Sequence, residues 1–164
     1  RLRILKTAMY LMITLVVLAL GVVGYFFATA KVTITAYDAK GAQATQNQAL
    51  FDQLKNDVAQ NTLRGTLFKT ATLGNATDYA FITYTVRLSN QCLVPIDMVE
   101  IQVEPDPEDV LQIGDTAVHS LNARSVGDIT ATILTAKDKD AVREVIVSYY
   151  VWGVSFTIRQ TIGG

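Results

Sequence analysis

Residues Thr7 to Ala30 form a run of 24 positions near the start of the chain without Asp, Glu, Lys, Arg or His, and this run constrains the architecture most. About 20 apolar residues in a helix cross the hydrocarbon layer of a bilayer, and burying a charge there is costly. The run is therefore long enough to span a membrane with some tilt. We predict a transmembrane helix at 7–30, a signal anchor that holds the rest of the chain at a membrane.

The charges on either side of the run orient it. Arg1, Arg3 and Lys6 precede it, whereas the first charge after it is the single Lys31. Positive flanks stay on the cytoplasmic side of a membrane. The basic flank at 1–6 is therefore predicted to be cytoplasmic and residues 31–164 extracytoplasmic, in a cell membrane crossed once.

Aromatic residues stand near both ends of the run. Tyr10 lies near its start, and Tyr25, Phe26 and Phe27 lie near its end. Aromatic rings favour the boundary between water and lipid, because that boundary accommodates both their apolar and their polar parts. These four residues are therefore predicted to belong to the membrane anchor at its two interfaces.

Small residues at the end of the run allow two further interpretations. Gly24 and Ala28 have a spacing that lets a second helix approach closely, although two small residues in an apolar helix need no such partner. Ala28-Thr29-Ala30 before Lys31 has the small-residue pattern of a signal-peptidase site, and cleavage after Ala30 would release a secreted ligand-binding domain. An apolar stretch of about 20 residues exceeds the about 7–15 of a signal peptide, which favours a retained anchor.

Residues 31–164 are numerous enough for one compact domain with its own core. They contain 11 Lys and Arg against 15 Asp and Glu, a net charge near −4. This balance argues against nucleic acid or an anionic membrane surface as a partner, because either would need a basic patch. Cys92 is the single cysteine, so no intrachain disulfide forms and the domain must depend on packing.

The periodicity of the exported part predicts strands and one helix. Val32, Ile34 and Ala36 alternate with other residues over 31–37, as in a strand, and 38–41 is predicted to be a turn. Thr45 and Gln48 have the spacing of a capping box, and the apolar residues that follow predict an amphipathic helix over 46–60. Further strands are predicted at 66–72, 79–89, 99–103, 110–113, 117–121, 129–133, 142–151 and 154–162, the last two joined at Trp152-Gly153.

Strands at regular intervals with turn residues between them predict an antiparallel sandwich of about seven to eight strands. The segments YTVRLSN, MVEIQVEPDP and REVIVSYYVWG carry this pattern between Phe81 and Gln160. Over these residues the chain resembles the immunoglobulin-like β-sandwich domains of bacterial membrane-anchored and surface proteins. The resemblance implies a binding or structural module rather than a catalyst.

Residues that commonly carry chemistry are sparse. His119 is the only histidine and Cys92 the only cysteine, so neither a catalytic triad nor a zinc site of three or four ligands can be assembled from them. We therefore predict no catalytic residue, no cofactor and no enzyme. Asp106, Glu108 and Asp109 offer carboxylate oxygens that Ca²⁺ would accept, although a solvated acidic turn explains the same residues.

Tyr149, Tyr150 and Trp152 make the last hairpin aromatic. They are predicted either to fill the core or to form a contact surface for a carbohydrate or a protein partner. Successive residues of a strand point to opposite faces, so Tyr149 and Tyr150 cannot both be buried.

These observations predict a single-pass anchor that presents a β-sandwich as a structural or interaction subunit of a cell-envelope or surface assembly. The expected partners are the lipid bilayer and another membrane or envelope protein. Because a strand is expected to begin at Lys31, little slack separates the domain from the bilayer. The alternative is a filament subunit resembling type IV pilins, which also join an apolar helix to a β-rich head, although Leu5 stands where the pilin pattern has Glu.

Overall fold

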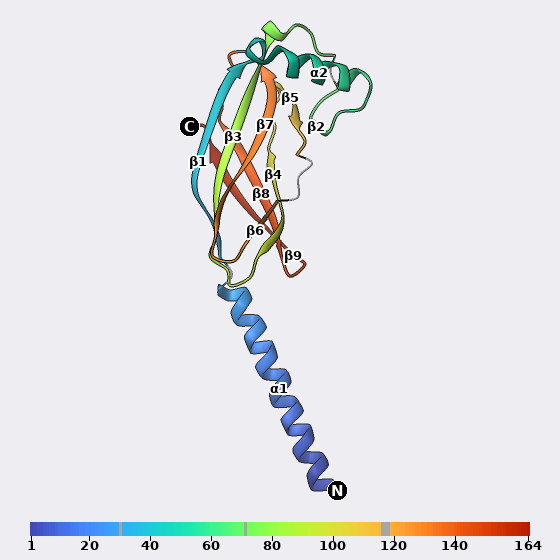
Figure 1. Cartoon of the computed structure of the whole chain (residues 1–164), viewed down its shortest axis with the longest axis vertical. Coiled ribbons are helices and arrows are strands. Elements are labelled where there is room, and N and C mark those ends of the chain that lie inside the picture. The colour runs from blue at the N-terminus through green and yellow to red at the C-terminus, as the bar shows by residue number, and fades with distance from the viewer. Residues whose placement is uncertain (30, 71, 116–118) are drawn as a thin grey trace.

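The computed structural model describes residues 1–29, 31–70, 72–115 and 119–164. A long helix, α1 (Leu2–Thr29), continues in line with a β-sandwich that contains the other elements (Figure 1). The 28 residues of α1 make it about 42 Å long at 1.5 Å per residue. None of its most apolar stretch is buried inside the molecule. The predicted apolar helix is confirmed, and Ala30, the last residue of the predicted span, lies outside the described residues.

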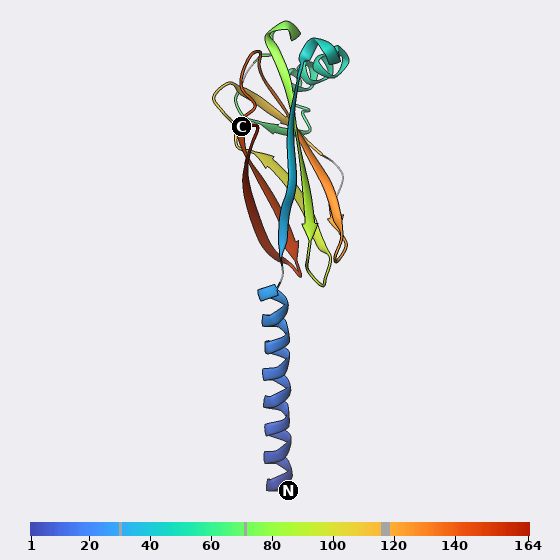
Figure 2. The same ribbon diagram turned by 90° about the vertical axis from the view of Figure 1, so that its left-hand side faces the viewer.

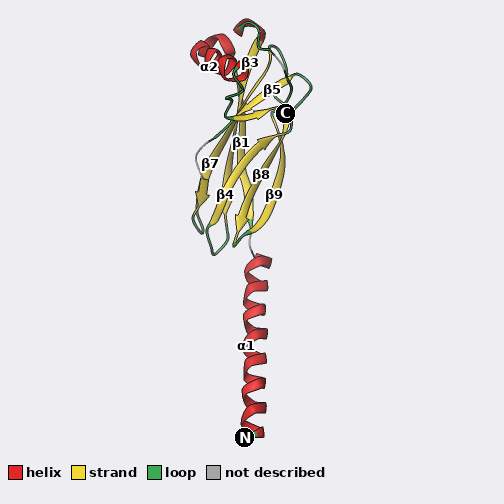
Figure 3. Ribbon diagram, turned by 90° about the vertical axis from the view of Figure 1, so that its right-hand side faces the viewer, coloured by secondary structure: helices red, strands yellow, loops and turns green. Residues whose placement is uncertain are grey.

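Two antiparallel sheets pack face to face to form the sandwich (Figures 1 and 3). The five-stranded sheet has the order β1-β3-β7-β5-β2, and the four-stranded sheet has the order β6-β4-β8-β9. The predicted antiparallel sandwich is confirmed, with nine strands in the described part of the chain. The strands are β1 (Val32–Gln43), β2 (Gly65–Leu67), β3 (Tyr79–Asn90), β4 (Ile96–Val103), β5 (Asp109–Ile113), β6 (His119–Leu121), β7 (Val126–Ala136), β8 (Arg143–Val151) and β9 (Val154–Ile162).

The first strand is longer than predicted, and the turn expected at 38–41 is wrong. Asp38 of β1 pairs with Thr85 of β3, and Lys40 pairs with Thr83. β3 has 12 residues and offers hydrogen-bonding partners along its whole length. β1 lies at the edge of its sheet, where polar side chains reach solvent without leaving the strand. The partner strand, and not the local turn propensity, therefore decides where β1 ends.

One predicted strand is shorter than expected, and another is described only in part. The strand predicted at 66–72 is reduced to β2, which pairs with only three residues of β5. The strand predicted at 117–121 is described only as β6, because 116–118 lie outside the described residues. Both β2 and β6 are the last strands of their sheets, so each has a partner on one side only.

The main core fills the space between the two sheets. Inward-facing aliphatic residues pack there, and Val86, Ile133 and Val147 are completely buried. Each such side chain contributes roughly 1.5–3 kcal/mol relative to its exposed state. Tyr84 is also fully buried, and its hydroxyl donates a hydrogen bond of 2.7 Å to the carbonyl of Ala141. That bond satisfies a polar atom that would otherwise destabilise the core.

A second, smaller apolar cluster lies on the outer face of the five-stranded sheet. It is covered by α2 (Gln48–Ala59), whose Phe51 and Leu54 belong to one buried cluster with Phe81, Leu111 and Leu134. The helix predicted over 46–60 is therefore confirmed. It closes the end of the sandwich opposite to α1 (Figure 2).

The start of this helix differs from the prediction. A short 3-10 helix, η1 (Ala44–Asn47), precedes α2, and the Asn47 side chain accepts a hydrogen bond from the backbone N–H of Leu50. Asn47 is thus the N-cap, a position that Asn favours. The predicted capping box of Thr45 and Gln48 is wrong, because Thr45 lies within η1.

The sandwich has two ends that differ in their surroundings. The helix-proximal end consists of the loops 91–95 and 122–125 and the β8–β9 turn at 152–153, all next to α1 (Figures 1 and 2). The distal end consists of α2 and the loops 104–108 and 137–142. The functional residues predicted from the sequence divide between these two ends.

Candidate functional site

The helix-proximal end contacts α1 through aromatic rings. The ring centroids of Phe26 and Trp152 are 5.5 Å apart, and those of Phe27 and Trp152 are 6.0 Å apart, both in edge-to-face geometry. Phe27 also stacks on Phe156 of β9 at 6.5 Å. Phe26 and Phe27 are consequently only partly exposed, unlike the preceding residues of α1. The β8–β9 turn therefore rests against the end of the apolar helix.

One buried amide joins the loops of this end. Asn90 is 1% exposed, and its side-chain N–H groups donate to the carbonyls of Val94, Leu121 and Asn122 at 3.0–3.2 Å. Its side-chain oxygen accepts from the backbone N–H of Cys92 at 3.0 Å. Asn90 therefore ties the loop 91–95 to the loop 122–125. Asn90 directly follows the strand predicted at 79–89, and sequence reasoning missed this role.

The backbone next to α1 is fixed as well. The N–H of Gln91 donates to the carbonyl of Lys31 at 2.9 Å, and Val32 pairs with Asn90 at the start of β1. Only residue 30 separates α1 from this hydrogen-bonded position. The predicted short connection between helix and sandwich is thus present, and residue 30 itself lies outside the described residues.

The predicted aromatic contact surface is divided by the structure. Tyr149 is 7% exposed and stacks on Phe156 inside the sandwich, so its inclusion in a contact surface is wrong. Tyr150 points to the other face of β8 and is partly exposed, as strand alternation requires. Trp152 is 54% exposed despite its contacts with α1. Trp152 is therefore the exposed aromatic group of the hairpin.

Apart from the two phenylalanines, the residues predicted to belong to the membrane anchor are exposed on α1. Tyr10 and Tyr25 are exposed by 64% and 62%. Gly24 has open space around it: a Cβ atom added there would meet nothing within 4 Å. Ala28 is exposed one turn further on. The flanking Arg1, Arg3 and Lys6 are exposed at the opposite end of the helix, about 30 Å away at 1.5 Å per residue.

The acidic turn that suggested Ca²⁺ is held by an arginine. Arg143, 3% exposed, donates to both carboxylate oxygens of Asp109 at 2.7 and 2.8 Å. The same guanidinium lies 2.9 Å from Asp106 and 3.2 Å from Asp140, whereas Glu108 is exposed. Arg143 thus occupies the position between these carboxylates that a cation would need. The described residues include no group of three His, Cys, Asp or Glu arranged for a metal ion.

Charge and burial compete at this ion pair. Burial favours the neutral acid of Asp109, but hydrogen bonds from Arg143 and from the Asp106 backbone N–H outweigh it and lower the pKa of Asp109. The hydrogen bonds to Asp109 raise the pKa of Arg143. Burial raises the pKa of Tyr84, whose ring lies nearby in the core. The distal end therefore keeps a fully charged Arg143–Asp109 pair near neutral pH.

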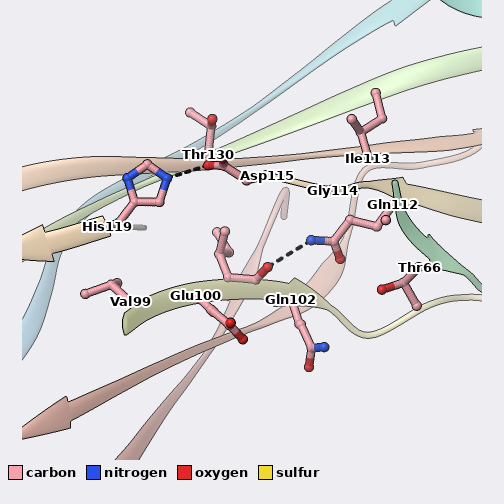
Figure 4. A pocket seen from close by; sticks show the side chains of 12 residues that line it. Thr66, Val99, Glu100, Gln102, Gln112, Ile113, Gly114, Asp115, His119 and Thr130 are labelled. Atoms are coloured by element: carbon pink, nitrogen blue, oxygen red, sulfur yellow. Dashed lines mark hydrogen bonds and ion pairs between the residues drawn. The ribbon is translucent and has the colours of Figure 1, made fainter. Parts of the chain in front are cut away.

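A pocket of about 310 Å³ lies between β4 and β5, where the two sheets separate (Figure 4). The Gln112 side chain bridges the sheets, accepting from the N–H of Val103 at 2.9 Å and donating to the carbonyl of Ile101 at 2.8 Å. His119 is hydrogen-bonded to Asp115 at the rim. Gln112 is thus held by backbone groups, and the pocket gathers no set of catalytic side chains among the described residues.

Two glycines allow the strands beside this pocket to approach. The N–H of Gly114 donates to the carbonyl of Arg64 at 2.7 Å. A Cβ atom on Gly114 would lie 2.6 Å from that carbonyl oxygen, and one on Gly65 would lie 2.2 Å from the carbonyl oxygen of Gln112. Such contacts are closer than packing permits, so glycine at both positions is required by the close approach of the two backbones.

No protein-family model and no curated protein sequence matches the chain. Among solved structures, the chain is similar to the crystal structure of the cupredoxin domain of amoB from Nitrosocaldus yellowstonii. The identity is 13% and the TM-score is 0.32, over 81% of this chain and 87% of that chain. The description of the fold therefore depends on the strand order and register of this chain itself.

Proposed function

We propose that this chain is a single-span membrane protein whose β-sandwich serves as a structural or interaction module on the extracytoplasmic side. The N-terminus with Arg1, Arg3 and Lys6 would lie in the cytoplasm. The module would carry no enzymatic activity and would contribute a subunit to a cell-envelope or surface assembly.

The observation that carries this proposal is the combination of an uncovered apolar helix with a sandwich joined to it almost without a linker. α1 is long enough to cross a bilayer and leaves its large apolar side chains exposed. Lipid is the environment that would cover them. The aromatic contacts between α1 and the β8–β9 turn support a retained helix, because cleavage after Ala30 would remove both phenylalanines from Trp152.

The conspicuous polar groups of the sandwich support a structural role. Asn90, Gln112 and Arg143 each bind groups of the same chain. Such networks rigidify a domain when every member is satisfied. A rigid head on a short connection would favour lateral contact with a neighbouring membrane or envelope protein over the capture of distant targets.

The side of the head offers a surface for such a contact. β1 is the edge strand of the larger sheet, and Tyr37 on it is 52% exposed. An edge strand presents unpaired backbone groups to which a partner strand can add. We propose this edge as the position of the protein partner.

Two measurements test the proposal. Carbonate washing of membranes that contain the full-length chain should leave it in the pellet, and N-terminal sequencing should show that α1 is retained. Release of the chain, or a mature N-terminus at Lys31, would instead indicate a secreted domain. Insertion of a flexible linker between Ala30 and Lys31 should reduce co-purification with the partner, and unchanged co-purification would contradict lateral contact.

A further inference from the structure

The β8–β9 turn carries an exposed tryptophan next to the apolar helix. We propose that this turn is a second membrane contact, in which Trp152 inserts among the lipid headgroups of the extracytoplasmic leaflet. The inference rests on the proposed retention of α1 as an anchor. It adds a lipid-binding surface on the sandwich itself.

The depth of Trp152 follows from its contacts with α1. Counted from Thr7, the about 20 residues that cross the hydrocarbon layer end at Phe26. Phe26 and Phe27 therefore lie at the outer interface. Trp152 is within 6.0 Å of both rings, so it lies at the same depth. A tryptophan ring is well suited to that depth, because its indole N–H stays hydrated while its rings face apolar groups.

The backbone conformation of the turn does not favour a tryptophan at position 152. Trp152 and Gly153 have φ values of +48° and +77° between the paired residues Val151 and Val154. Two-residue hairpins with positive φ at both positions favour Asn-Gly, and a bulky residue at the first position is unfavourable. The strained position nevertheless holds a large ring that stays 54% exposed, as an interaction outside the sandwich would require.

Other residues at and beside the helix-proximal end are also apolar and exposed. Leu93, Val126 and Val154 are exposed by 50%, 58% and 46%. The loops 91–95 and 122–125 and the turn contain Arg124 and no carboxylate, and Lys31 lies beside them. Carboxylates would be repelled by lipid phosphates and costly to bring near hydrocarbon. The exposed apolar side chains and the positive charges therefore match a lipid surface that is continuous with the one around α1.

Fluorescence of the full-length chain tests the inference, because Trp152 is its only tryptophan. The probe is a phosphatidylcholine vesicle whose acyl chains carry bromine either near the headgroup or near the bilayer centre. We expect shallow bromine to quench Trp152 roughly twofold, and more than deep bromine, since indole rings lie at the interface. The matched control is Trp152→Asn with Gln53→Trp, which moves the fluorophore to an exposed position on α2 at the distal end. The control should not be quenched by either lipid.

The outcomes distinguish a failure of the headgroup contact from a failure of the anchor. If the chain floats with carbonate-washed vesicles but Trp152 is no more quenched than the control, the headgroup contact is wrong and the anchor stands. If the chain leaves the vesicles, both proposals fail. If Trp152 is shielded from a quencher dissolved in water only in native membranes, and never in vesicles of lipid alone, a protein covers the turn. That result would overturn the lipid assignment.

Discussion

The distal end of the sandwich is held together by buried charge, whereas the helix-proximal end is held together by a neutral amide. At the distal end, Arg143 joins Asp109, Asp106 and Asp140. At the helix-proximal end, Asn90 joins two loops without any charge. Both residues are almost completely buried, and both satisfy several backbone or side-chain groups.

The difference corresponds to the distance of each end from α1. In the proposed arrangement the distal end faces water, which can solvate its exposed carboxylates. The helix-proximal end faces the proposed membrane, where an ion pair would lose hydration and a neutral amide would not. The two networks are therefore built from different groups at the two ends. The following substitutions test this contrast, from the largest expected effect to the smallest.

Removing the arginine should have the largest effect on stability. Arg143→Met leaves Asp109 buried without its partner, and such changes typically cost about 3–5 kcal/mol in unfolding free energy. Urea denaturation of the full-length chain in detergent micelles measures the change. Arg159→Met is the matched control, because its pair with Glu144 is exposed and should contribute little to stability. Equal losses in the two variants would contradict a special role for the buried pair.

The same pair should make stability depend on pH in the acid range. The pKa of Asp109 is lowered in the folded state, so the unfolded chain binds the proton more tightly. The stabilisation is present above the unfolded value of about 3.9 and is lost as pH falls from there through the folded pKa. Urea midpoints recorded from neutral to acid pH should fall less steeply for Asp109→Asn than for the native chain. A parallel pair of curves would show that other carboxylates cause the acid sensitivity.

The amide of the helix-proximal end should contribute less. Asn90→Ala leaves buried carbonyls without donors, at a cost of about 1–3 kcal/mol. We expect faster hydrogen exchange in 91–95 and 122–125 and unchanged exchange in α2. Asn122→Ala is the control, because Asn122 takes part through its backbone carbonyl and its side chain is exposed. Faster exchange at both ends would mean that Asn90 supports the whole domain and not this end alone.

Much of the fold could be predicted from local sequence patterns. The uncharged run fixed α1, and strict alternation identified β3, β8 and the hairpin at Trp152-Gly153. The pattern failed at β1, since the turn propensity of Asp38 to Gly41 is overruled by pairing with β3. Register with a distant strand is a tertiary property and leaves no local signal.

The candidate sites were less accessible to sequence reasoning for the same reason. Asp106 and Asp109 were recognised as a cluster, but Arg143 lies 34 positions from Asp109 and reaches it only through the packing of the sheets. Asn90 gave no signal, because an Asn at the end of a strand usually marks a turn. Trp152 was recognised as an aromatic residue of either the core or a contact surface, and only its contact with Phe26 and Phe27 places it beside the apolar helix.

The smallest expected effect on stability is also the sharpest test of the contrast between the two ends. Trp152→Asn installs the residue that this turn favours, so the gain in turn geometry should offset the lost ring contacts to within about 1 kcal/mol. If the helix-proximal end faces lipid, the same variant should weaken the contact of the turn with the lipid surface. In proteoliposomes, trypsin should then cut at the exposed Lys31 several-fold faster in the variant than in the native chain. Only the molecules whose sandwich faces outward are counted. A clear loss of stability with an unchanged cleavage rate would show that Trp152 serves the fold of the sandwich. The two ends would then differ in composition only, and the membrane would not be the reason.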